Sequence, residues 1–214
     1  MAERPETPVE VREVTAGLWL WRLEHPHWRP GQGWDRVVAC TCVESHGEVI
    51  VLDPLAPPTS AISLWQRLDA HPPTAVVILK PDHVRDVDVF VRRYNSRAFG
   101  PRLFFRYDIP ESELEWIEPG SEIPGGLVAL YDGRGRCETP LWLEEQSTIV
   151  FADALTAPEG QLRVWDSPWH QKRALPALRA LLDLPFERVL VSHGEPVHSR
   201  AGYEHALELP PWKG

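Results

Sequence analysis

The segment that decides the fold runs from Ala75 to His83 and reads Ala-Val-Val-Ile-Leu-Lys-Pro-Asp-His. Its five apolar residues are typical of a buried strand, and the Lys-Pro-Asp-His that follows predicts a polar turn at the carboxyl end of that strand. The next segment, 84–95, repeats valine and phenylalanine at helical spacing with arginine and aspartate between them, which predicts a helix half-buried against a sheet. Strand, turn and helix in this order indicate a layered α/β domain.

The same patterns recur on both sides of this segment. Before it, a helix is predicted to begin at Thr59, an N-cap type of residue, and to end at His71. The stretch 98–138 is rich in Pro, Gly and Glu and holds only short strand candidates, and no fixed-period repeat or linker divides the chain. We therefore expect one mixed α/β domain over residues 1–214. The other predicted strands are 11–24, 36–45, 48–54, 101–107, 126–132, 139–145, 147–153 and 188–194, and the later helices are 172–184 and 200–209.

Composition narrows the class of partner. The formal net charge of −9 disfavours nucleic acid and anionic membrane surfaces. No apolar run reaches the roughly 20 residues of a membrane helix, and the acidic, polar start is unlike a signal peptide. The three cysteines, Cys40, Cys42 and Cys137, have no CxxC spacing and predict neither a disulfide framework nor a thiolate zinc cage. We expect a cytoplasmic protein with a small-molecule substrate and no nucleic-acid or membrane partner; no motif indicates its oligomeric state.

Three of the predicted strands end in side chains that bind metals. These are Asp82 with His83, Asp153, and His193. Sites in α/β folds form at the carboxyl ends of strands, and two carboxylates with two imidazoles are ligands that divalent metals use. A single Asp-His pair also arises by chance, so only the joint arrangement favours a metal site.

These residues resemble motifs of the metallo-β-lactamase superfamily, and the resemblance extends from about Gly17 to about Leu207. It implies an α/β fold, a four-layer αββα metallo-β-lactamase-like sandwich. Segment 151–155, Phe-Ala-Asp-Ala-Leu, is similar to the family's Phe-Gly-Asp-Ala-Leu and implies that Asp153 is the acid that normally bridges two metals. Segment 191–194, Val-Ser-His-Gly, matches the closing strand with the last histidine, His193. Asp53, at the end of 48–54, is implied to be the acid that supports the site from beneath.

The chain departs from the family at one of the two metals. Segment 78–83 lies over the family's His-x-His-x-Asp-His, but Ile78 and Lys80 replace the two early histidines. A third histidine, expected before Asp153, is also missing, because no histidine occurs between positions 83 and 170. All three losses fall on the family's first metal. The set for its second metal is complete, and we therefore predict one divalent ion (zinc, iron or manganese) held by Asp82, His83, Asp153 and His193.

A single ion of this kind lowers the pKa of a bound water, so the sequence predicts a mononuclear metal-dependent hydrolase that uses a metal-bound hydroxide on an ester, thioester or lactone-type bond. Asp153 is a candidate to orient or deprotonate the water, and Lys80 to stabilise an oxyanion. The alternative for Lys80 is a solvated turn lysine. A catalytically inactive binding or scaffold protein of the same fold is the rival function. A second ion held by Lys80 or Glu138 is a third possibility and requires a deprotonated amine.

Several other side chains have weaker cases. His25 and His27 have His-x-His spacing in an aromatic loop, where packing or substrate contact is the more usual role. Glu138 either faces the site or is solvated at the start of a strand. Arg85 and Asp86 follow the metal turn and are candidates to support the ligands. For most of the ten tryptophans, packing is the favoured role.

Overall fold

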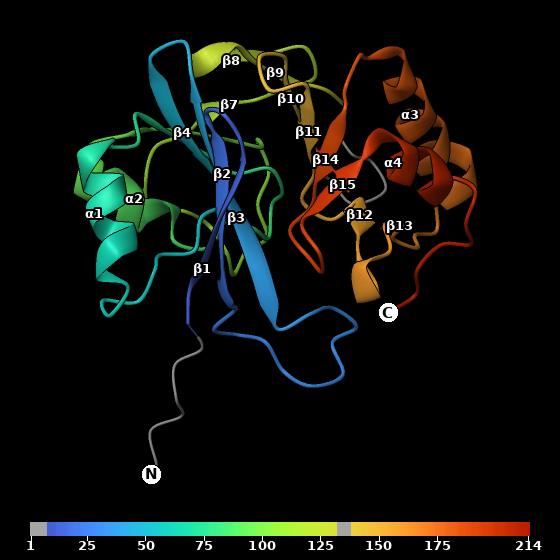
Figure 1. Cartoon of the computed structure of the whole chain (residues 1–214), viewed down its shortest axis with the longest axis horizontal. Coiled ribbons are helices and arrows are strands. Elements are labelled where there is room, and N and C mark those ends of the chain that lie inside the picture. The colour runs from blue at the N-terminus through green and yellow to red at the C-terminus, as the bar shows by residue number, and fades with distance from the viewer. Residues whose placement is uncertain (1–7, 132–137) are drawn as a thin grey trace.

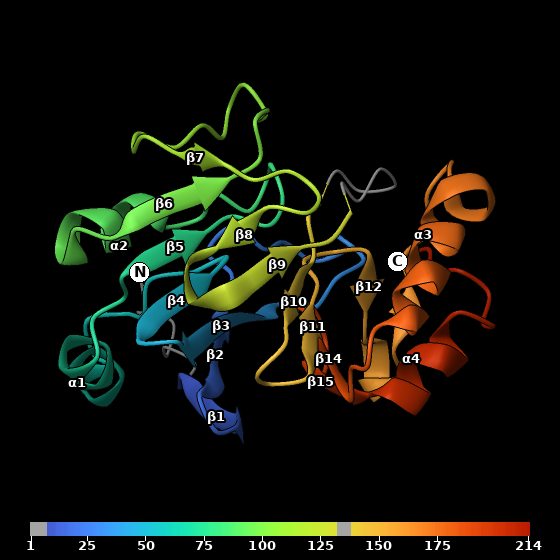
Figure 2. The same cartoon turned by 90° about the horizontal axis from the view of Figure 1, so that it is seen from above.

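The computed structural model describes residues 8–131 and 138–214. Two β-sheets lie face to face between two layers of helices (Figure 1). Helices α1 (Ile62–Ala70) and α2 (Val87–Tyr94) cover the outer face of the first sheet, and α3 (Leu175–Ala180) and α4 (Arg200–Ala206) cover the outer face of the second. The predicted four-layer αββα sandwich is therefore confirmed, and Figure 2 shows its layers from above.

The first sheet has its strands in chain order. The four strands β1 to β4 are antiparallel neighbours, and β4 to β7 are parallel neighbours. The predicted strand 11–24 is in fact two strands, because Gly17 adopts a φ of 70° and turns the chain back. The strands are β1 (Glu10–Thr15), β2 (Leu18–Glu24), β3 (Val37–Ser45), β4 (Glu48–Leu52), β5 (Ala75–Val77), β6 (Arg97–Gly100) and β7 (Glu115–Trp116).

The second sheet has the order β15-β14-β11-β10-β9-β8. The neighbouring strands β14 and β11 are parallel, so both end at the same edge of the sheet. A π-helical turn at His170–Ala174, then α3, then a 3₁₀ turn at Leu181–Asp183 follow one another without a break where the sequence predicts a helix over 172–184. The strands are β8 (Glu122–Ile123), β9 (Leu127–Ala129), β10 (Leu141–Leu143), β11 (Thr148–Val150), β14 (Arg188–Leu190) and β15 (Val197–Ser199); β12 (Leu155–Thr156) and β13 (Arg163–Val164) form a separate ribbon.

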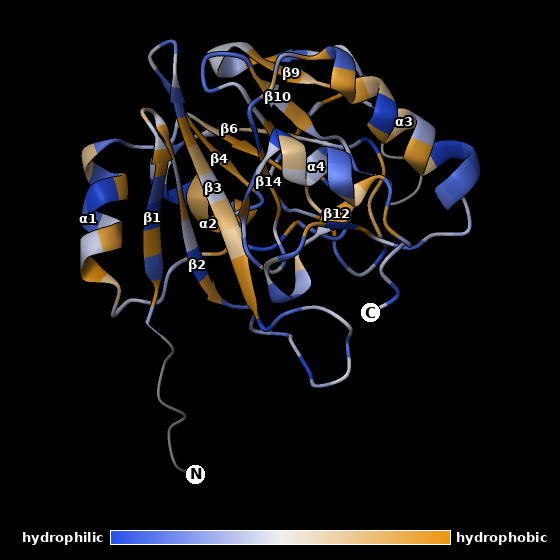
Figure 3. Cartoon of the chain, turned by 45° about the vertical axis from the view of Figure 1, so that its right-hand side comes forward, coloured by the Kyte–Doolittle hydropathy of each residue, from blue (hydrophilic) through white to orange (hydrophobic). Residues whose placement is uncertain are grey.

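The central strands are apolar on both faces because each face meets a different core. In β4, Ile50 and Leu52 face the core between the sheets, whereas Val51 packs under α1 and α2. In β11, Val150 faces the core between the sheets and Ile149 packs under α3 and α4. Figure 3 shows β4 as a largely hydrophobic ribbon. Burial on two faces is why the strands read as continuous apolar runs in the sequence.

Two further predictions of local structure are wrong. Helix α1 begins at Ile62 and its N-cap is Ala61, not Thr59, because the amide of Ala61 is already bonded to the carbonyl of Pro58 in a preceding turn. Segment 101–107 forms no strand: its Leu103 is 78% exposed, so the burial that would stabilise a strand is missing. In the described part of the chain, no helix has both the length and the apolar character needed to cross a membrane.

Candidate metal centre

Three segments that follow strands converge at one edge of the sandwich. His83 lies in the turn after β5 of the first sheet, while Asp153 and His193 follow the parallel strands β11 and β14 of the second. The two sheets are joined here, since the amide of Ala39 in β3 donates to the carbonyl of Ser192 at 2.9 Å. His83, Asp153 and His193 are all buried, and each offers a ligand atom within 4.8 Å of the other two.

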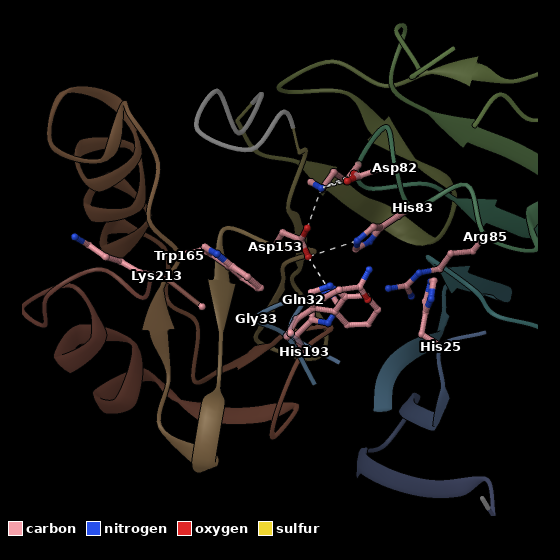
Figure 4. Close-up of a pocket in the computed structure, with 14 residues that line it drawn as sticks. His25, Gln32, Gly33, Asp82, His83, Arg85, Asp153, Trp165, His193 and Lys213 are labelled. Carbon is pink, nitrogen blue, oxygen red and sulfur yellow. Dashed lines mark hydrogen bonds and ion pairs between the residues drawn. The ribbon is translucent and has the colours of Figure 1, made fainter. Parts of the chain in front are cut away.

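Asp153 is the centre of this group. Its Oδ1 lies 3.1 Å from Nε2 of His193 and 3.4 Å from Nε2 of His83 (Figure 4). Among the residues that the structure describes, Oδ1 is a buried oxygen without a hydrogen bond of ordinary geometry. Two imidazole nitrogens and one unsatisfied carboxylate oxygen facing one another are the donor set of a divalent metal, so these three residues fit the ion that the sequence predicts.

Asp53 holds the ring of His83 in place. Its Oδ2 lies 2.7 Å from Nδ1 of His83, and its Oδ1 accepts a hydrogen bond of 2.7 Å from the amide of Leu79. The carboxylate of Asp53 accepts from Nδ1, which leaves Nε2 as the atom of His83 that would bind an ion. This agrees with the supporting place that the family resemblance implies for Asp53. His193 has no such partner in the described chain; its ring packs against Trp34 with the centroids 5.0 Å apart.

Lys80 is buried, only 6% exposed, so the alternative of a solvated turn lysine is wrong. Its Nζ contacts Oδ2 of Asp153 at 2.8 Å and also pairs with the carboxylate of Asp82. Asp82, whose side chain is 37% exposed, is thus turned toward the ammonium and lies outside the group of three. The structure brings together three of the four predicted ligands; Asp82 as a fourth stays a prediction, because its carboxylate would have to leave Lys80 for the ion.

The carboxylates control the charges around the site. Burial and the charge of Arg85 act to lower the pKa of His83, but the carboxylates of Asp153 and Asp53 outweigh them and raise it to about 9. Burial acts to raise the pKa of Asp153, but the charges of His83 and Lys80 hold it well below its usual range. Burial lowers the pKa of His193. Without metal, Asp153 is therefore an anion facing a protonated His83, and a bound ion would replace that proton.

Glu138 is completely buried, so the alternative of a solvated strand-start glutamate is also wrong. Its Oε2 accepts hydrogen bonds from the backbone amides of Asp153 and of Ala154, the latter at 2.7 Å. Burial, and next the charge of Asp153, raise the pKa of Glu138 to about 7. Glu138 thus fixes the backbone that carries Asp153 and lies outside the group of ligand atoms. Cys137, which precedes it, is outside the described residues.

A cavity of about 560 Å³ opens over the three candidate ligands (Figure 4). His25 and Trp34, from the loop between β2 and β3, form one wall, and Trp165 of the β13 region forms another. His27 does not line it; its ring lies 5.8 Å from that of His25. Sequence reasoning missed the place of Arg85 in this cavity, although its position two residues after His83 was the available signal. The remaining lining residues are Gly31, Gln32, Gly33, Lys80, Asp82, Lys213 and Gly214.

No protein family model matches the sequence, and no curated protein sequence matches it significantly. Solved structures do match. The metallo-β-lactamase FIM-1 from Pseudomonas aeruginosa, in its mono-zinc form, superposes with a TM-score of 0.72 at 18% identity over 97% of each chain. A metallo-β-lactamase from Hirschia baltica gives 0.69 at 16% identity over 94% of this chain and 97% of the other. One from Pontibacter korlensis gives 0.67 at 16% identity over 94% and 98%.

The chain therefore has the metallo-β-lactamase fold, as its sequence motifs predicted. Similarity at this level establishes the fold, and a fold hosts many chemistries. The function must accordingly be argued from the side chains that this chain places at the site.

Proposed function

We propose that this protein is a hydrolase that depends on one divalent metal ion held by His83, Asp153 and His193. The observation that carries the proposal is the buried Oδ1 of Asp153, which faces two imidazole nitrogens and has no hydrogen bond of ordinary geometry in the described chain. The fold supports the proposal, because one similar structure, that of FIM-1, is a metallo-β-lactamase in a mono-zinc form.

The donor set favours a catalytic rather than a structural ion. Structural zinc sites are closed by four protein ligands, whereas catalytic sites have three and keep a position open. Two imidazoles and one carboxylate suit zinc, iron or manganese. The cavity above the three side chains provides the space for a substrate at the open position.

Lys80 supports a single ion. Its ammonium lies 2.8 Å from Oδ2 of Asp153, the carboxylate oxygen that does not face the two imidazoles. Burial acts to lower the pKa of Lys80, but the carboxylates of Asp153 and Asp82 outweigh it and raise the pKa. The amine therefore stays protonated, and a charged ammonium excludes a neighbouring cation and cannot be its ligand.

When bound, the ion would supply Lewis acidity, which lowers the pKa of a water molecule and polarises a carbonyl group. Asp153 would orient that water through its carboxylate. Its lowered pKa makes it a weak proton acceptor, so we assign it positioning rather than proton abstraction. Lys80 would hold Asp153 in place and offer positive charge to an oxyanion at the same edge of the cavity. The bond cleaved would be an ester, thioester or lactone of a small molecule.

Metal analysis of protein purified without added metal tests the proposal. We expect about one ion per chain in the wild type, none in His193→Ala, and one in the matched control His205→Ala, whose histidine is exposed on α4. A screen of aryl esters, thioesters and lactones with the same three proteins should show turnover only where the ion is present. No ion in the wild type, even after reconstitution, would instead support the binding or scaffold protein.

A further inference from the structure

Arg85 has an unusual place in the metal turn. It lines the cavity two residues after His83, and its φ of 47° is in the left-handed region that side chains other than glycine rarely adopt. Figure 4 shows its side chain extending from the turn toward His25 and the interior of the cavity. A strained backbone that directs a cation into a cavity indicates a function for that cation.

The charge of Arg85 has no counter-ion in the described chain. Its Nη1 donates to the carbonyl of Asp53 at 2.6 Å and lies 3.5 Å from that of Ala39, and both acceptors are neutral. Its Nε is buried without a hydrogen-bond partner, and no carboxylate of the described residues lies within ion-pair distance of it. Lys80, in the same cavity, is by contrast paired with two carboxylates.

The positive charge reaches across the cavity. Burial, followed by the charge of Arg85, lowers the pKa of His25 to about 3, so this ring is neutral. Lys80, Arg85 and Lys213 are the lysine and arginine residues of the lining, and the two acidic side chains, Asp82 and Asp153, both contact Lys80 and neither contacts Arg85. A cavity with uncompensated positive charge in a chain of net charge −9 selects for anions locally.

We propose that Arg85 binds a carboxylate group of the substrate, so that the substrates are small esters, thioesters or lactones that carry a carboxylate. The planar guanidinium suits a carboxylate, and both carbonyl contacts are made by Nη1, which leaves Nη2 to donate to an oxygen of the ligand. The choice of substrate class rests on the proposed hydrolase function. The anion site itself does not, because Arg85 is not one of the candidate metal ligands.

Calorimetry on the metal-free protein tests the anion site separately from hydrolysis. The probe is benzoate, and benzamide is its neutral match in shape. We expect benzoate to bind at least about tenfold more tightly than benzamide to the wild type, and Arg85→Gln to remove that preference. Arg179→Gln, which removes an exposed arginine of α3, should leave it unchanged. Equal binding of the two probes by the wild type, or an unchanged preference in Arg85→Gln, would overturn the proposal.

Arg85→Gln also removes the hydrogen bond to Asp53, and the variant could fail to fold. In that case the wild type alone decides, through the ¹⁵N-detected Nε–H resonance of Arg85. This resonance should shift on addition of benzoate and not of benzamide; no shift with benzoate would refute the site.

Hydrolysis by the metal-loaded protein separates the two proposals. We expect a higher kcat/KM for 4-carboxyphenyl acetate than for its methyl ester, by about tenfold, and loss of that difference in Arg85→Gln. Benzoate binding that depends on Arg85 without hydrolysis of either ester would leave the anion site standing and remove the hydrolase. Equal hydrolysis of both esters, with no preference for benzoate over benzamide, would support the hydrolase and refute the anion site.

Discussion

The two oxygens of Asp153 face two differently built regions. Oδ1 faces the imidazoles of His83 and His193 and has no hydrogen bond of ordinary geometry in the described chain. Oδ2 faces the ammonium of Lys80, which also pairs with Asp82. On one side the chain offers lone pairs to a cation, and on the other it supplies the cation itself. The comparison shows that the buried carboxylate of Asp153 already has a positive partner on one side, Lys80, and would need a cation only on the other.

The largest effect is expected when Asp153, which belongs to both regions, is removed. Asp153→Ala should abolish metal binding and turnover. It should also lower the free energy of unfolding of the metal-free protein by about 3–5 kcal/mol, because Lys80 then loses a buried partner. Metal analysis and urea denaturation measure the two effects. Glu113→Ala, which removes an exposed carboxylate, is the control. A variant that still binds one ion would show that Asp153 is not a ligand.

Removing the lysine affects one region alone. Lys80→Ala should lower turnover about 10²-fold while metal content stays at one ion per chain, on the scale of a lost oxyanion donor. Steady-state kinetics and metal analysis measure this, and Lys172→Ala, which removes an exposed lysine, should behave like the wild type. Unchanged turnover would remove Lys80 from the mechanism. Two ions in the variant would mean that the ammonium alone keeps a second metal out.

The same contrast explains what the sequence could predict. The apolar strands and the polar residues that end them are local patterns, so a layered α/β domain and the segments of His83, Asp153 and His193 were predictable, whereas the four-layer sandwich was implied only by the resemblance to the metallo-β-lactamase superfamily. The contact between Lys80 and Asp153 depends on how the two sheets pack together, and the spacing of residues in the sequence does not give the distance between them. The sequence predicted Lys80 as an oxyanion donor, which stays a prediction; what the sequence could not give is that its ammonium is buried between two carboxylates. The cavity place of Arg85 was missed for the same reason, since its φ of 47° is set by the turn's packing.

Asp53→Asn tests whether the hydrogen bond from Asp53 positions the ring of His83 for metal binding. In Asp53→Asn, one amide group replaces two accepting oxygens and cannot serve both Nδ1 of His83 and the amide of Leu79. We expect metal affinity to fall about 10- to 100-fold, the usual cost of losing a partner that orients a ligand. Competition with a chelating dye measures it, with Asp69→Asn, an exposed aspartate paired with Arg93, as the control. Unchanged affinity would show that His83 is positioned by packing alone.

A carboxylate held mainly by hydrogen bonds gives the reference for both regions. Asp88 of α2 accepts from the hydroxyl of Ser112, and from the amides of Glu111 and Ser112 at 3.0 and 2.8 Å. Burial acts to raise its pKa, but these hydrogen bonds, that of the hydroxyl first, outweigh it together with the charge of Arg92 and lower the pKa. The stabilisation is therefore present above the unfolded-state pKa and is lost as the pH falls through the folded-state value. Asp88→Asn should cost about 1 kcal/mol near pH 7, and its unfolding curves should converge with those of the wild type near pH 3. Urea denaturation at a series of pH values measures this difference in the free energy of unfolding. A difference that persists at low pH would show that the contacts of Asp88 do not depend on its charge. As a control, the metal content of the variant should equal that of the wild type.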